Sequence, residues 1–400
     1  MTTKRLRAAI VGGGISGLAA ANSLHHRGID VTVFEQSDAL GEVGAGLIIT
    51  PNSLRQLDRL GLGEALAKAG APVADGSEYY RMDGSVVGRI VITDSRGEKG
   101  IYGMHRADLL QLFADALPPG AVRTGHRCTG FEQNGETAHL KFANGEVFAA
   151  DVVVGADGIH SVLQKYVVEP ASPEYSGSRA FRGLLAADKA PHWRPNAQQV
   201  WMGDGKHFIV FPVRGGALLN YVGFVPTGDE TVESWSAIGD RDELVASFAG
   251  WDPRVVGLLD KVERCFWWGL YDRKPLPRWS NGRLTLIGDA AHAMLPHVGQ
   301  GANQSIEDGV ALAVFLQDRD PGEIAEAVQR YESFRRERTD FIQAESRRSG
   351  LRYDSRYQDL DQRDHEIKNV AGFRHWVYDY DVEQAALAQA AAYPAPLRRV

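Results

Sequence analysis

The chain has 400 residues, of which 44% are hydrophobic and 24% charged, and its formal net charge is -7 with a pI near 6.0. This composition is typical of a globular enzyme of two or three domain-sized units, and it gives no reason to expect a nucleic acid or a membrane as partner. No apolar segment approaches the roughly 18 residues that a membrane span needs. Cys128 and Cys265 lie far apart without a CxxC pattern, so we expect neither a disulfide framework nor a metal site, and a cytoplasmic setting.

The first predicted elements are a strand, a tight turn, a helix and a second strand between Ala8 and Glu35. Three glycines with GxGxxG spacing mark the turn. Gly12 allows the chain to leave the first strand sharply, Gly14 allows a pyrophosphate to approach the backbone, and Gly17 allows the helix to pack closely on the sheet. The pattern predicts a dinucleotide site.

The start of this helix is the expected position of the phosphates. Ile15 and Ser16 contribute backbone N–H groups there, and the positive end of the helix dipole favours an anion. Glu35, at the end of the second strand, is placed to accept hydrogen bonds from a ribose, and it would repel a 2′-phosphate. The basic residues 4–7 before an apolar run are also compatible with a secretory signal, but the glycine spacing argues against one. The motif alone does not distinguish NAD from FAD.

A glycine-rich loop and a helix follow. Gly46 lies in the loop, which predicts either a close approach of a ligand or a plain surface turn. Arg106 lies in the first turn of a helix expected between Met104 and Leu117. Its guanidinium is suited to a cofactor's sugar or phosphate, although an arginine at this position is more often solvated.

Two further predicted strands end in glycine-flanked acids. Asp157, in GADG at 155–158, either caps a following helix or contacts a ligand. Asp289 ends a buried strand, where open α/β sheets hold ligands. The loop and helix start after it form a second site of positive potential and add four candidate cofactor residues: Pro296, Gly299, Gly301 and Ala302.

The three strand ends are expected to meet at one edge of a doubly wound sheet. NAD needs only the first of them, whereas the longer FAD needs further contacts, so FAD is favoured. The chain between 181 and 279 is rich in strands and aromatic residues and is suited to walling a flat apolar pocket. We therefore predict an α/β protein with a Rossmann-like FAD-binding domain (1–75, 101–180 and 280–345), an interleaved, mostly β substrate domain (76–100 and 181–279) and C-terminal helices (346–400).

These motifs resemble those of the class A flavoprotein aromatic hydroxylases, which have the 4-hydroxybenzoate hydroxylase fold. The resemblance covers nearly the whole chain, through GxGxxG at 12–17, the DG motif at 155–158 and the GD motif at 288–292 followed by Pro296. It is greatest for the salicylate hydroxylases and 3-hydroxybenzoate 6-hydroxylases. It implies that Asp289 binds the ribityl chain, that Arg106 binds FAD, and that Asp157 contacts the FAD pyrophosphate region, with the nicotinamide cofactor as a further partner to consider.

A flavin hydroxylase needs a reductant, and the sequence has no second GxGxxG, so NADH or NADPH is expected to bind transiently. Oxygen adds to the reduced flavin to give a hydroperoxide, and a phenol becomes reactive toward it when deprotonated. The resemblance suggests His207 as that base, although it is also compatible with a hydrogen-bonded strand histidine. His297 matches a histidine of salicylate hydroxylases and would polarise the phenol or bind a carboxylate, unless it is only a loop residue. Candidate anchors for a substrate carboxylate are Arg182, Arg214 and Tyr221, and Tyr221 is also a candidate catalytic residue.

The sequence therefore predicts an FAD-dependent, NAD(P)H-consuming monooxygenase, a monomer or homodimer, that hydroxylates a small aromatic acid of the salicylate type with O2. Alternatives within this class are the hydroxylation of 3-hydroxybenzoate, 6-hydroxynicotinate or another aromatic or N-heteroaromatic ring, and the epoxidation of a non-phenolic substrate. Pro296 replaces a glutamine of the 3-hydroxybenzoate enzymes, and Ile48 replaces a histidine of the 6-hydroxynicotinate enzymes, which argues against both. From a different class, the first 35 residues alone also suit an NAD-dependent dehydrogenase or an NAD-binding sensor.

Overall fold

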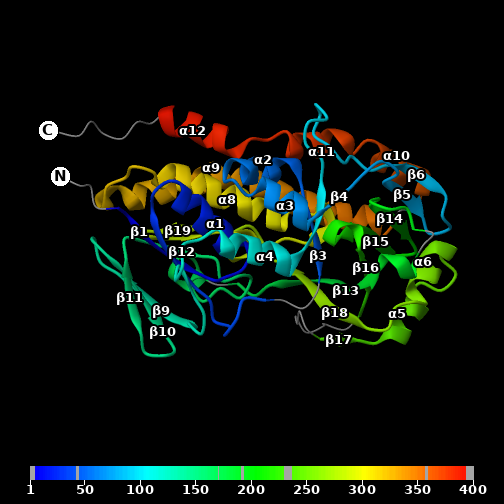
Figure 1. The fold of residues 1–400 in the computed structure, drawn as a ribbon, viewed down its shortest axis with the longest axis horizontal. Coiled ribbons are helices and arrows are strands. Elements are labelled where there is room, and N and C mark those ends of the chain that lie inside the picture. The colour runs from blue at the N-terminus through cyan, green and yellow to red at the C-terminus, as the bar shows by residue number, and fades with distance from the viewer. Residues whose placement is uncertain are drawn as a thin grey trace.

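The computed structural model describes residues 5–41, 45–169, 171–190, 193–228, 237–355 and 359–392. The molecule is longer than it is wide, with a parallel sheet toward one end and a second large sheet toward the other (Figure 1). The helix α9 (Ile324–Tyr353) contacts strands of both sheets and so joins the two ends. Parts of the predicted C-terminal segment, at 356–358 and 393–400, lie outside the described residues.

The parallel sheet is built from short apolar runs that are buried on both faces. Its strand order is β19-β20-β12-β1-β2-β8, and all neighbours are parallel except β19 and β20. The strands are β1 (Arg7–Val11), β2 (Asp30–Phe34), β8 (Val122–Arg123), β12 (Val152–Gly155), β19 (Ser280–Asn281) and β20 (Leu284–Leu286). The strands β1, β12 and β20, which precede the three predicted turns, are therefore direct neighbours.

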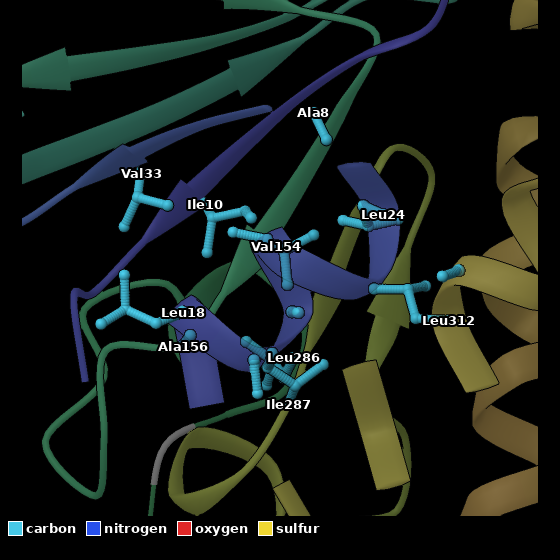
Figure 2. Packing of buried hydrophobic residues seen from close by; sticks show 14 of the residues in the cluster. Ala8, Ile10, Leu18, Leu24, Val33, Val154, Ala156, Leu286, Ile287 and Leu312 are labelled. Carbon is cyan, nitrogen blue, oxygen red and sulfur yellow. The ribbon is translucent and has the colours of Figure 1, made fainter. Parts of the chain in front are cut away.

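Two helices pack tightly beside this sheet. The helix α1 (Ile15–His26) inserts Leu18 and Leu24 among the side chains of β1 and β12, as Figure 2 shows. The helix α8 (Gly301–Leu316) adds Leu312 to the same cluster. A Cβ atom on Gly309 would lie 2.7 Å from the Cα of Ala20, so the two helices touch backbone to backbone.

The second sheet has eight strands in the order β17-β18-β13-β16-β15-β14-β5-β6. They are β5 (Glu78–Arg81), β6 (Val86–Arg89), β13 (Glu174–Ala186), β14 (Gln199–Gly203), β15 (Lys206–Val213), β16 (Leu218–Pro226), β17 (Ile238–Gly239) and β18 (Cys265–Asp272). One face packs on α5 (Arg241–Ser247) and α6 (Pro253–Leu259). The opposite face lines the cavity described below.

The remaining elements complete the two ends. Two small sheets contain β3 (Gly46–Ile49), β4 (Ala71–Pro72) and β7 (Tyr102–His105), and β9 (Cys128–Gln133), β10 (Ala138–Phe142) and β11 (Val147–Ala150). The other helices are α2 (Pro51–Arg59), α3 (Gly63–Ala69), α4 (Arg106–Asp115), α7 (Asp289–His292), α10 (Leu360–Lys368), α11 (Ala371–Tyr378) and α12 (Val382–Ala392). Short 3₁₀ turns occupy Gln164–Tyr166, Ala187–Lys189, Arg214–Gly216, Pro296–Val298 and Pro321–Glu323.

The predicted fold class is confirmed: a parallel α/β region, a mostly β region and C-terminal helices are all present. One local prediction is wrong, because the turn after β12 leads into the 3₁₀ turn Gln164–Tyr166 and not into an α-helix. Among the described residues, no helix combines the length and the apolar character that crossing a membrane requires.

The contact between α1 and α8 gives a testable prediction. Gly309→Ala should lower the free energy of unfolding by about 1–3 kcal/mol, because the added methyl group forces the two backbones apart. Gly257→Ala is the matched control: its Cβ would meet nothing within 4 Å, so alanine there should be neutral or stabilise by up to ~1 kcal/mol. Thermal unfolding of both variants measures the difference, and equal midpoints would contradict the close packing.

Candidate active site

The three glycine turns meet in space, as the sequence predicts. Gly12 has φ +110°, and a Cβ atom there would collide with the carbonyl oxygen of Ala156, which follows β12. A Cβ atom on Gly17 would collide with the carbonyl of Gly12, and one on Gly288 with the hydroxyl of Ser16. Each turn therefore approaches its neighbour more closely than any side chain would permit.

The start of α1 faces open space. A Cβ atom on Gly14 would meet nothing within 4 Å, and Gly14 lines the cavity together with Ile15 and Ser16. Glu35 directly follows β2 beside this turn, where its carboxylate accepts hydrogen bonds from the N–H groups of Gly13 at 2.7 Å and Ser37 at 2.9 Å. The carboxylate is therefore fixed in position, although Glu35 does not itself line the cavity.

The cavity has a volume of about 340 Å³ and extends from the glycine turns to the eight-stranded sheet. It collects most of the predicted site residues from segments far apart in the chain. Those that line it are Gly14, Ile15, Ser16, Gly46, Arg106, Arg182, Asp289, Pro296, His297, Gly299, Gly301 and Ala302. Those that do not line it are Gly12, Gly17, Glu35, Asp157, His207, Arg214 and Tyr221.

Asp157 holds the turn after β12. Its Oδ2 accepts hydrogen bonds from the N–H groups of Val162 at 2.8 Å and Leu163 at 3.3 Å, so it bonds the turn before Gln164–Tyr166 and does not cap an α-helix. Its Oδ1 is buried without a partner among the described residues, and burial raises the pKa of the carboxyl. Its neighbours Ala156 and Gly158 line the cavity. Contact of Asp157 itself with FAD stays a prediction.

Asp289 lies at the cavity, and a buried ion network holds the turn before it. Gly288 donates its N–H to Oδ2 of Asp308 at 2.9 Å. The same carboxylate contacts His292 Nε2 at 2.6 Å, and its other oxygen accepts from Arg335 Nε at 2.9 Å. Burial raises the pKa of Asp308, but His292 and Arg335 outweigh it and lower the pKa to about 2. The sequence offered no signal for this network.

The loop 296–300, which we call the flavin-side loop, is pinned by one amide. Asn303 donates to the carbonyl oxygens of Gly299 at 2.8 Å and Ile48 at 2.9 Å, and its Oδ1 accepts from the N–H of Thr50 at 2.9 Å. Gly299 has φ +67°, which favours glycine there. These bonds tie the loop to the start of α8, whose residue Gly301 lines the cavity.

Two histidines form a chain with an aspartate. Nδ1 of His297 lies 3.3 Å from Nε2 of His207, and Nδ1 of His207 lies 2.7 Å from Oδ1 of Asp354. His207 is 0% exposed and its ring stacks on Phe224 at 4.1 Å. Burial, and then the neighbouring His207, lower the pKa of His297 well below its ordinary value. His207 shares a face of β15 with cavity-lining residues, but only His297 reaches the cavity.

Two candidate anchors are placed elsewhere. Tyr221 lies on the opposite face of β16, within the apolar cluster under α5 and α6, and its hydroxyl donates to the carbonyl of Arg264 at 3.3 Å. Arg214 makes a two-bond ion pair with Asp108 at the surface, both bonds at 2.8 Å. The predictions for Tyr221 and Arg214 at this site are therefore wrong. Arg182 does line the cavity, with its guanidinium 4.8 Å from the ring centre of Trp268.

The C-terminal helices supply cavity residues that sequence reasoning missed. Tyr353, Arg374 and Tyr378 line the cavity, although no site residue was predicted in the C-terminal segment 346–400. The one available signal was the aromatic-rich run FRHWVYDY at 373–380, which places an arginine among aromatic residues.

The described residues fit FAD. The start of α1 offers open space and N–H groups for a pyrophosphate, Asp289 offers a carboxylate for hydroxyl groups, and the start of α8 offers a positive dipole for the ring. The comparisons agree. A family model described as FAD binding domain matches residues 5–349. The chain belongs to this FAD-binding domain family.

Several relatives of this flavoprotein are named as monooxygenases or hydroxylases of aromatic acids. A 3-amino-4-hydroxybenzoate 2-monooxygenase of Streptomyces platensis is 38% identical over 95% of this chain and 98% of its own length. A salicylate hydroxylase of Pseudomonas putida is 34% identical over 97% and 95%. A solved salicylate hydroxylase substrate complex superposes with a TM-score of 0.83 at 30% identity, covering 98% of this chain and 99% of that one.

The chain is therefore a flavin-dependent aromatic monooxygenase, and its cofactor is FAD. The predicted family, enzyme class and cofactor are confirmed, with NAD(P)H as the co-substrate typical of the family. The alternative of an NAD-dependent dehydrogenase or NAD-binding sensor does not hold, because the family match extends far beyond the first 35 residues.

Removal of the Asp289 carboxylate tests its predicted role. Asp289→Ala should weaken FAD binding about 10- to 100-fold, the effect of losing hydrogen bonds to a charged group. Asp289→Asn, which keeps an acceptor oxygen, should lie between the alanine variant and the wild type. Asp260→Ala, an exposed aspartate away from the cavity, is the control. Titration of the FAD-free protein followed by flavin fluorescence gives the affinities, and wild-type affinity in Asp289→Ala would remove this role.

Proposed function

We propose that this flavoprotein hydroxylates a small aromatic acid that carries a ring hydroxyl or amino group, using NAD(P)H and O2. The observation that supports this most is the chain His297–His207–Asp354, which brings a proton acceptor to the cavity. When bound, FAD supplies the activated oxygen. The protein's own residues then have to orient the ring, accept its proton and exclude water.

His297 is suited to accept the proton of a ring hydroxyl. Its pKa is lowered from about 6.5, so the imidazole is neutral at pH 7 and stays neutral on acidification until well below pH 6.5. If Nδ1–H of His207 donates to Asp354, then Nε2 of His207 accepts from Nδ1–H of His297. This arrangement leaves Nε2 of His297 as the basic nitrogen, while Asp354 fixes the orientation of His207.

The walls of the cavity beside His297 are apolar. Ile209, Phe211, Val222 and Phe224 project into it from β15 and β16. Such a wall favours a flat ring and keeps water away from the reacting atoms. These residues support an aromatic substrate without selecting one ring pattern.

Two ring patterns are the leading candidates. A salicylate-type ortho-hydroxybenzoate, hydroxylated with or without loss of carbon dioxide, follows from the similarity to the salicylate hydroxylases. A 3-amino-4-hydroxybenzoate follows from the higher identity of the Streptomyces relative. Both are small acids with an electron-rich ring, as attack by an electrophilic oxygen requires.

The proposal predicts which ring compounds stimulate the enzyme. A panel containing salicylate, 3-amino-4-hydroxybenzoate, 3-hydroxybenzoate and 6-hydroxynicotinate should include at least one acid that accelerates NADH or NADPH oxidation and yields a hydroxylated product. Product must be measured directly, because peroxide release without hydroxylation also consumes NAD(P)H. Oxidation without product from every acid would contradict the proposal.

The protonation state of His297 gives a separate prediction. His297→Ala should lower the hydroxylation rate about 100-fold or more while FAD stays bound, since general bases contribute on this scale. Because His297 is already neutral, its protonation should not lower the wild-type rate between pH 8 and pH 6.5. An ionisation in that range that disappears in His297→Ala would contradict the lowered pKa, and an unchanged rate in the variant would place the base elsewhere.

A further inference from the structure

Arg374 is a cavity-lining residue of the C-terminal helices. It projects from α11, is 8% exposed and lines the cavity. Nη1 donates to the carbonyl oxygen of Val298 at 2.8 Å, and Nη2 donates to the hydroxyl of Tyr353 at 3.2 Å. A guanidinium has five N–H groups, and Nε of Arg374 is buried without a partner among the described residues.

The charge of Arg374 is not compensated by the described residues. No carboxylate among them forms an ion pair with it, and its polar surroundings are the hydroxyl groups of Tyr79, Tyr353 and Tyr378. Burial raises the pKa of Tyr79 and of Tyr378, so both stay neutral at pH 7 and carry no negative charge. A buried guanidinium without a counter-ion is unfavourable.

Arg335 is a contrasting buried guanidinium in the same protein. Arg335 is 0% exposed and is bonded to Glu307 at 2.6 Å and Asp308 at 2.9 Å. Its charge is matched by the protein itself. Arg374 is similarly buried but opens on a cavity, so an anion in that cavity would complete its environment.

We propose that Arg374 binds the carboxylate of the aromatic substrate. This inference rests on the proposed function and deepens it, because it assigns a residue to the acid group. Val298, which Arg374 contacts, directly follows His297 in the flavin-side loop. One small ring acid can therefore place its hydroxyl group at His297 and its carboxylate at Arg374.

Tyr353 contacts both Arg374 and His207. Its hydroxyl accepts from Arg374 and lies 3.5 Å from the hydroxyl of Tyr79, while its ring centre is 5.4 Å from that of His207. A carboxylate at Arg374 therefore meets two hydroxyl groups as well as the guanidinium. The ring attached to it lies against the apolar wall of β15 and β16.

The test compares each acid with its own amide. Wild-type protein loaded with FAD is titrated with salicylate and salicylamide, and with 3-amino-4-hydroxybenzoate and its amide, and binding is followed by the change in flavin absorbance. For whichever acid binds more tightly, we expect the wild type to bind the acid about 30-fold or more tightly than the corresponding amide. Arg374→Met should lose most of this ratio. Binding of the amide should change little.

Arg182→Met tests the competing anchor, because Arg182 was also a candidate and is a buried arginine that lines the cavity. The assignment of the carboxylate to Arg374 gives a definite expectation for this variant. It should keep the preference for the acid. Arg374→Lys retains the charge without the planar fork and should keep part of the preference; it carries the test if the methionine variant loses FAD or unfolds. The proposal is overturned if the wild type does not distinguish acid from amide, if the Arg374 variants keep the full ratio, or if only Arg182→Met loses it.

Failure of the anchor is distinguishable from failure of the proposed function. If no ring acid gives a hydroxylated product with the wild type, the proposed function fails. If the wild type hydroxylates a ring acid and the Arg374 variants still prefer acid to amide, only the assignment of Arg374 fails.

Discussion

The site depends on how closely three parallel strand ends approach one another. Gly12 contacts the backbone after β12, Gly17 contacts Gly12, and Gly288 contacts Ser16, each at a distance that leaves no room for a side chain. Because these turns approach so closely, the start of α1, the turn after β12 and Asp289 border a single cavity. A long cofactor such as FAD needs contacts of this kind from remote parts of the chain.

A buried ion network also holds the turn at Gly288 in place. Asp308 binds the N–H of Gly288 and pairs with Arg335, so the cofactor turn, α8 and α9 share one network. Ser16 bonds to Ser305 of α8 at 2.8 Å and ties in the first turn. Breaking one partner of such a network leaves an uncompensated charge, which typically costs about 3–5 kcal/mol. The network therefore stabilises the geometry that the glycines permit.

The sequence was sufficient for features that local patterns encode. Glycine spacing predicted the three turns, and motif resemblance singled out His297. Tyr221 was placed wrongly because strand residues alternate between faces, and a shift of one position reverses the side. Arg374 could not be predicted, because its function depends on which charges lie near it in space and not in sequence. For the same reason Asp308 and Asp354 gave no signal.

A crystal structure of the protein with bound FAD and a ring acid tests the central claim most directly: one cavity between the two sheets receives both molecules. The account predicts the pyrophosphate at Gly14–Ser16, the ribityl chain at Asp289 and the flavin ring at the start of α8, with the acid between His297 and Arg374. Density for FAD outside this cavity, or with its ribityl chain turned away from Asp289, would contradict it.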